Sequence, residues 1–128
     1  MELAPNAMEL DEVARLATAH GEVTGVLAAQ SADGERSYLV AFGADDGRQW
    51  LLLDDAARPV ADRARVREVS SLVALSELAA EAAGKADEAR VASPAYLDAV
   101  GTSALAASMG IVEAFVAEVE ARYKLPLR

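Results

Sequence analysis

The ionisable side chains of this sequence offer several starting points for chemistry, and none of them forms a recognised catalytic motif. His20 is the only histidine, and Gly21 follows it at the end of an amphipathic stretch. A cationic imidazole in the last turn of a helix is favoured by the helix dipole, and the sequence assigns no nucleophile or acidic partner to it. We therefore interpret His20 as a capping or surface residue and predict no catalytic residue.

Two pairs of adjacent aspartates, Asp45-Asp46 and Asp54-Asp55, are the next candidates, because carboxylates bind metal ions. The pairs lie at opposite ends of a predicted strand and are nearly 30 Å apart when that strand is extended, so they cannot share an ion. Neither pair has the spacing of a calcium-binding loop, whereas aspartate is common in turns. The sequence contains no cysteine, which excludes thiolate ligands and disulfides. We predict no metal site and no cofactor.

Four arginines gather where the second predicted helix begins, at Arg58, Arg63, Arg65 and Arg67. Positive charge at this end of a helix is unfavourable for the helix dipole, so the cluster needs another explanation. Arg58, Arg63 and Arg67 are candidates for an anion site or an acidic-peptide site, assisted by the exposed amides of the helix start. The alternative is that the arginines form ion pairs with the neighbouring aspartates, which are Asp54, Asp55 and Asp62.

Large apolar side chains form another candidate site. If residues 45–47 are a three-residue hairpin loop with glycine at its left-handed position, Phe42 lies opposite Trp50. This register puts Tyr38, Phe42, Trp50 and Leu52 on one face of a sheet. On that face the four side chains could line a pocket for a small ligand.

These candidates must be positioned by one helix, three strands and two further helices. Hydrophobic periodicity, turn residues and capping residues predict a helix at about 7–20, strands at about 22–30, 36–43 and 48–54, and helices at about 60–83 and 93–123. The fold class is therefore α+β: a three-stranded antiparallel β-meander with one preceding helix and two following helices (αβββαα), the C-terminal helix being long.

The first hairpin loop, Ala32-Asp33-Gly34, resembles the second in ending with glycine. It predicts that Val26 pairs with Val40 and that Leu27 pairs with Leu39. In this meander both faces of the sheet carry apolar side chains, with Val23 on the face opposite Phe42. An antiparallel sheet with one face in water alternates apolar and polar residues, so we expect both faces to be covered.

The last helix is the place where we expect an interface. About thirty residues at 1.5 Å each give a helix of about 45 Å, longer than a three-stranded sheet is wide. Residues 101–110 include two glycines, which weaken a helix interior and need compensation. Small residues on one side can let another element approach closely, either within the chain or in a second subunit. The interface residues that we predict are Gly101, Ala104, Leu105, Ser108, Ile111, Val112 and Phe115.

Length, charge and hydropathy limit the classes of function. The 128 residues suit a single domain over 1–128, with 1–6 as an extension, since Met1-Glu2-Leu3 recurs as Met8-Glu9-Leu10. The net charge of −9 repels phosphate backbones, so we expect no nucleic acid partner. No apolar run of about 18 residues and no signal-peptide pattern is present, and we expect no membrane partner. Together with the lack of cysteine, this favours the cytoplasm.

These observations predict a non-catalytic acidic protein that acts through protein–protein association. We expect a homodimer, because two apolar sheet faces and a long helix need more cover than the first two helices supply. A further protein partner is possible. The alternatives are a small-ligand-binding protein that uses the aromatic sheet face, and an enzyme that uses dispersed residues such as Tyr38, Arg48 and Glu68.

Overall fold

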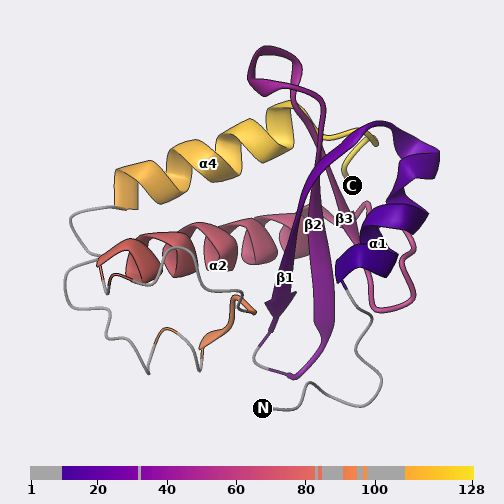
Figure 1. Ribbon diagram of the computed structural model, residues 1–128. Coiled ribbons are helices and arrows are strands. Elements are labelled where there is room, and N and C mark those ends of the chain that lie inside the picture. Colours follow the sequence, from indigo (N-terminus) through magenta and orange to yellow (C-terminus); the bar gives the residue numbers. More distant parts are fainter. Residues whose placement is uncertain (1–9, 32, 83, 85–90, 95–96, 98–108) are drawn as a thin grey trace.

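The computed structural model describes residues 10–31, 33–82, 84, 91–94, 97 and 109–128. In chain order these form α1 (Leu10–Ala17), β1 (Val23–Gln30), β2 (Arg36–Phe42), β3 (Gln49–Leu53), α2 (Arg63–Ala82) and α4 (Met109–Ala121) (Figure 1). The strands make one antiparallel sheet in the order β1-β2-β3. The predicted α+β class, with one helix before a three-stranded meander and two helices after it, is confirmed.

Helices cover both faces of the sheet, as the apolar character of both faces predicts (Figure 1). On one face Val13 and Ala17 of α1 pack against a cluster that includes Tyr38, Val40 and Phe42. On the other face α2 and α4 contribute a second cluster with the sheet residues, and its buried helix members are Val66, Val69, Val73 and Val119. The sheet is thus the central layer between two apolar cores.

The pairing of β2 with β3 differs from the prediction by one residue. Phe42 pairs with Gln49 and Ala41 pairs with Trp50, so Phe42 does not face Trp50. The left-handed glycine of the connection is Gly43, with φ +81°, and Gly47 does not have a positive φ. Because side chains alternate along a strand, a shift of one residue moves all the β3 side chains to the opposite face.

The pairing of β1 with β2 is as predicted over most of its length. Val26 pairs with Val40 and Leu27 pairs with Leu39, and Gly34 has the left-handed φ of +87° that the loop requires. Near the start of β1 the register shifts between Val23 and Gly25. This bulge puts Val23 against the same core as Phe42, so its predicted placement on the opposite face was wrong.

Two helices follow their predicted periodicity to different degrees. In the helix predicted at about 60–83, apolar and small residues recur at helical spacing along one side, and in α2 that side is buried. Its buried members include Val66, Val69, Val73, Ser76, Ala79 and Ala80. In α1 only Val13 and Ala17 are buried, whereas Leu10 and Leu16 are both 38% exposed. A helix of eight residues presents only a short stripe of residues to the sheet, and Leu10 and Leu16 lie at the edges of this stripe.

Short segments from elsewhere in the chain cover the outer strands of the sheet. Beside β3, the Trp50 amide donates to the carbonyl of Arg122 at 3.0 Å, and the Lys124 amide donates to the carbonyl of Trp50 at 2.9 Å. Beside β1, the Gln30 amide donates to the carbonyl of Ala92 at 2.8 Å. These bonds satisfy outward-facing backbone groups of both edge strands.

The last predicted helix is described in part. Pro94 and Leu97 are helical, and α4 extends to Ala121, close to the predicted end. Residues 95–96 and 98–108 lie outside the described part of the chain. None of the helices that the structure describes is both long and apolar enough to cross a membrane.

Candidate functional site

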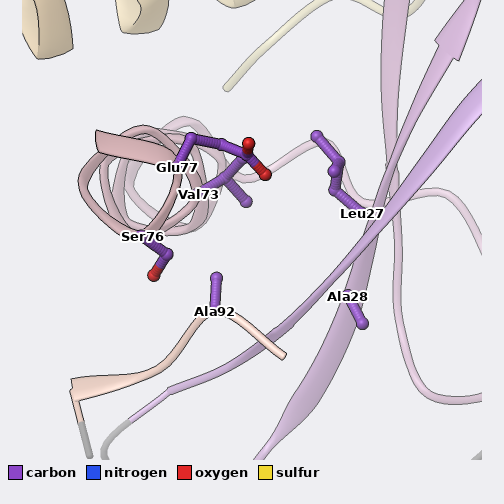
Figure 2. A pocket seen from close by; sticks show the side chains of 6 residues that line it. All are labelled: Leu27, Ala28, Val73, Ser76, Glu77 and Ala92. Atoms are coloured by element: carbon purple, nitrogen blue, oxygen red, sulfur yellow. The ribbon is translucent and has the colours of Figure 1, made fainter. Parts of the chain in front are cut away.

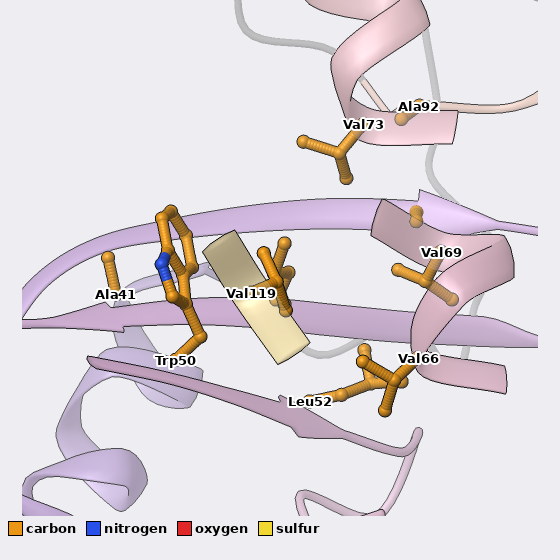
Figure 3. Packing of buried hydrophobic residues seen from close by; sticks show 10 residues of the cluster. Ala41, Trp50, Leu52, Val66, Val69, Val73, Ala92 and Val119 are labelled. Carbon is orange, nitrogen blue, oxygen red and sulfur yellow. The ribbon is translucent and has the colours of Figure 1, made fainter. Parts of the chain in front are cut away.

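The four residues of the predicted ligand site do not share a face. Tyr38 and Phe42 belong to the core beneath α1. Trp50 and Leu52 belong to the core beneath α2 and α4, which Figure 3 shows. All four are at most 3% exposed. The prediction of one aromatic face was wrong because it depended on the β2–β3 register, and this arrangement does not provide a pocket lined by all four side chains.

Trp50 instead joins β3 to α4. Its ring packs edge-to-face on Phe115, with the ring centroids 5.2 Å apart. Its Nε1–H donates to the carboxylate of Glu118 at 3.2 Å. Arg48 directly precedes β3, and its guanidinium lies 5.9 Å from the centre of the indole ring of Trp50, within the range of a cation–π interaction. Trp50 is therefore a structural anchor for the C-terminal helix.

The arginine cluster joins α2 to other parts of the chain. Arg63 donates to the Glu120 carboxylate at 2.7 Å, and Arg67 pairs with the other oxygen of the same group. Glu120 belongs to α4, and its side chain is 15% exposed, so the pair of arginines holds the two helices together. This places the carboxylate of Glu120 between two of the three residues that we predicted to bind an anion.

The other arginines are also paired with groups of the chain. Arg58 lies 3.6 Å from the carboxylate of Asp54, one of the ion pairs that the alternative interpretation predicts. Arg65 donates to the buried hydroxyl of Ser37 at 2.8 Å and to Glu68 at 3.0 Å. Asp62 was also predicted to pair with an arginine, and its carboxylate accepts a hydrogen bond from the amide of Ala64.

Tyr123 is an important residue that the sequence analysis did not identify. Its hydroxyl accepts a hydrogen bond from the amide of Leu52 at 2.8 Å and donates to the carbonyl of Val60. Burial raises the pKa of Tyr123 to about 12, because a phenolate in this position would lose its hydration. One oxygen thus connects the C-terminal segment, β3 and the segment that precedes α2.

The remaining polar candidates form turns. Asp54 accepts hydrogen bonds from the amides of Ala56 and Arg58, and Asp46 lies in a short 3₁₀ turn, Asp45–Gly47, as the turn interpretation predicts. His20 ends a 3₁₀ turn that follows α1 and is exposed. Within the described ranges, no three His, Asp or Glu side chains lie close enough together to hold a metal ion.

The surface of α4 that points away from the sheet is the remaining candidate. Only three of its thirteen residues are polar, and these are all glutamates. The larger residues that face inward are Val112, Phe115, Val116 and Val119. The exposed residues of α4 include Glu113 and Glu118 and five uncharged residues. We call these five the outer face of α4, and they are Gly110, Ile111, Ala114, Ala117 and Ala121.

The predicted interface residues divide between the two sides of this helix. Ile111 belongs to the outer face and is 60% exposed. Val112 is buried within the chain, and Phe115 packs against Trp50. The four other predicted interface residues lie outside the described part, and they are Gly101, Ala104, Leu105 and Ser108. The structure therefore leaves Ile111 as the described member of the predicted set that a second molecule can reach.

No protein-family model, curated protein or solved structure matches this chain.

Proposed function

We propose that the protein is non-catalytic and acts through protein–protein association, as a homodimer whose contact is the outer face of α4. The observation that carries the proposal is a strip of five uncharged residues on the exposed side of α4, flanked by Glu113 and Glu118, which the described part of the chain leaves uncovered. The solvent side of a surface helix normally carries charged and polar residues, so an uncharged strip there favours a contact with another molecule. Ile111, at 60% exposed, is the most exposed of the large apolar side chains in the described part of the chain.

The shape of the outer face suits a second helix. Gly110, Ala114, Ala117 and Ala121 recur at intervals of four, three and four residues, the spacing at which one side of a helix contacts a partner helix. Their side chains are short, so the axes of two helices can approach closely. A two-fold dimer brings the same face of both copies together and closes the assembly.

The charge of the protein supports a protein partner over a nucleic acid. A net charge of −9 disfavours contact with phosphate backbones, whereas an uncharged strip of small residues is compatible with a second copy of the chain. We assign the protein to the cytoplasm, which is supported by the lack of cysteine. The proposal includes no metal and no cofactor.

Light scattering coupled to size-exclusion chromatography at micromolar concentration tests the proposal. The wild-type chain should have twice its monomer mass of 13.4 kDa. Ala114→Arg should have the monomer mass, because Ala114 is exposed in the single chain and the long charged side chain prevents close approach of a second helix. The folded content of this variant, measured by circular dichroism, should equal that of the wild type.

The matched control is Ala64→Arg, which places the same side chain on an exposed position of α2. This variant should remain a dimer. A wild-type mass of 13.4 kDa throughout the micromolar range would exclude the homodimer. A dimer that both variants leave intact would show that the contact lies elsewhere than the outer face of α4.

A further inference from the structure

The pocket between β1 and α2 is too small for a ligand. Its volume is about 20 Å³, whereas pockets that bind small molecules have about 300–1,000 Å³. Figure 2 shows that the hydroxyl of Ser76 turns away from this space, whose lining residues are Leu27, Ala28, Val73, Ser76, Glu77 and Ala92. The charged surface beside the outer face of α4 is better suited to hold a partner.

Two arginines beside α4 share one carboxylate. Arg63 and Arg67 of α2 both pair with Glu120, so two positive charges meet one negative charge. The arginine side chains are 51% and 57% exposed, whereas that of Glu120 is 15% exposed. Neither arginine has a second carboxylate partner in the part of the chain that the structure describes. On its solvent side this arginine cluster can therefore accept another carboxylate.

Glu113 has the complementary property. It lies on the same side of α4 as Glu120, because positions seven residues apart are separated by close to two helical turns. Glu113 is exposed, and no ion pair joins it to another of the described residues. One side of α4 thus carries a negative charge toward its start and the arginine cluster about 10 Å further along the helix axis.

A two-fold dimer with antiparallel α4 helices brings these charges together. The two-fold axis is then perpendicular to both helices, so it reverses their direction and keeps the same side of each together. The small residues of the outer face recur at intervals that read the same in both directions, and Gly110 faces Ala121 of the partner subunit. Glu113 then lies beside Glu120 of the partner subunit and the two arginines that hold it.

A parallel dimer brings opposite sides of the two helices together, because its two-fold axis runs along them. Glu118 lies on the opposite side from Glu113, since its carboxylate accepts a hydrogen bond from Trp50 of β3. In a parallel pair, a flanking residue approaches the residue five positions later on the other helix, so Glu113 would meet Glu118 of the partner subunit. Like charges in contact are unfavourable, and symmetry repeats this contact.

We propose that the two copies pack with antiparallel α4 helices, and that Glu113 of each copy pairs with Arg63 and Arg67 of the partner subunit. This inference rests on the homodimer proposed above, and it names the second carboxylate of the arginine cluster. Because the arginines are about half exposed, the ion pairs determine the orientation of the contact more than its strength. The effect of salt on affinity still follows the net charge of −9 on each copy.

Disulfide trapping tests the orientation, because the chain has no cysteine of its own. Gly110→Cys and Ala121→Cys are made as separate proteins, one of them with an affinity tag. Both positions are exposed, and a Cβ at Gly110 meets nothing within 4 Å. Oxidation of the mixture should give the disulfide between the two variants. Either variant alone should not cross-link, because its two thiols are about 16 Å apart along the helix axis.

Glu113→Arg tests the ion pair, because the two orientations predict changes of opposite sign. In the antiparallel dimer the new arginine faces Arg63 and Arg67, so the dissociation constant should rise about three- to tenfold. In a parallel dimer it would face Glu118, and the dissociation constant would fall. Asp11→Arg is the charge-matched control, since it changes the net charge equally on α1, which covers the other face of the sheet. Sedimentation equilibrium at fixed ionic strength measures all three proteins.

The outcomes separate this inference from the homodimer itself. Cross-linking of each cysteine variant alone, with no disulfide between the two in the mixture, would overturn the antiparallel order and leave the dimer intact. Antiparallel cross-links with equal dissociation constants for Glu113→Arg and Asp11→Arg would overturn the ion pair. A wild-type chain that stays monomeric would overturn both the homodimer and this inference.

Discussion

Tyr123 shows how one side chain holds distant parts of this fold together. Its hydroxyl meets the amide of Leu52 and the carbonyl of Val60, and Leu52 lies 71 residues earlier in the sequence. The neighbouring backbone of Arg122 and Lys124 pairs with Trp50. Without the hydroxyl, the amide of Leu52, a residue that is fully buried, has no equivalent partner within this arrangement.

We predict that Tyr123→Phe lowers the free energy of unfolding by about 1–3 kcal/mol, the cost of leaving a buried backbone group unsatisfied. Urea unfolding at neutral pH measures it. Phenylalanine keeps the ring, so the loss reports on the hydroxyl. A variant as stable as the wild type would mean that water replaces the tyrosine oxygen.

The same residue predicts a dependence on alkaline pH. The pKa of Tyr123 is raised to about 12 in the folded protein, above the ordinary value of 10.0. A raised pKa means that the folded state favours the neutral phenol, so its stabilisation is complete below pH 10 and is lost as the pH rises toward 12. The difference in stability between wild type and Tyr123→Phe should therefore narrow over this range.

The register of the β2–β3 hairpin decides which side chains of β3 enter which core. Its connection places Gly43, not Gly47, in the left-handed region. A Cβ at Gly43 would also lie 3.4 Å from the carbonyl oxygen of Gly47, whereas a Cβ at Gly47 meets nothing within 4 Å. The two glycines are thus unequal, although the sequence pattern favours Gly47.

We predict that Gly43→Ala lowers the free energy of unfolding by about 1–2 kcal/mol, the penalty of a left-handed alanine. Gly47→Ala should be neutral or stabilising by up to about 1 kcal/mol, because alanine restricts the unfolded chain. Denaturant unfolding of both variants measures the difference. The reverse order of stability would support the three-residue loop, and with it the pairing of Phe42 with Trp50.

The ion pairs of Arg63 and Arg67 with Glu120 show why the contacts between α2 and α4 could not be predicted from the sequence. Glu120 and Lys124 have the spacing of an ion pair within one helix. In the structure Glu120 pairs instead with arginines of α2, 57 residues from Arg63, and Lys124 lies above the ring of Phe42. Tertiary proximity supplied partners that a local pattern does not contain.

The net negative charge of each chain opposes the proposed association of two copies. Each copy carries a charge of −9, and Glu113 and Glu118 on α4 are exposed beside the proposed dimer contact. Repulsion between the copies is long-ranged at low ionic strength, whereas the contact itself is uncharged. Salt should therefore strengthen the dimer.

We predict that the dissociation constant of the proposed homodimer falls as sodium chloride is raised from 50 mM to 500 mM, since the Debye length shortens from more than 10 Å toward about 4 Å. Sedimentation equilibrium at several protein concentrations measures it. A dimer that weakens as salt is added would indicate a contact made of ion pairs, which the outer face of α4 does not offer.

The order of elements, the pairing of Val26 with Val40 and the buried side of α2 could be predicted from the sequence. These features depend on periodicity and turn residues within short stretches of chain. The turns at Asp54 and Gly34 could be predicted in the same way.

The β2–β3 register, the partners of Glu120 and the position of Tyr123 depend on contacts between elements that are distant in the sequence. Two hairpin loops that differ by one residue in register satisfy nearly the same local turn preferences, and apolar residues on both faces of β3 permit either choice. The packing of Trp50 of β3 against Phe115 of α4 favours the register that the structure shows. Contacts across 57 to 71 residues depend on how whole elements pack, which no short stretch of sequence specifies.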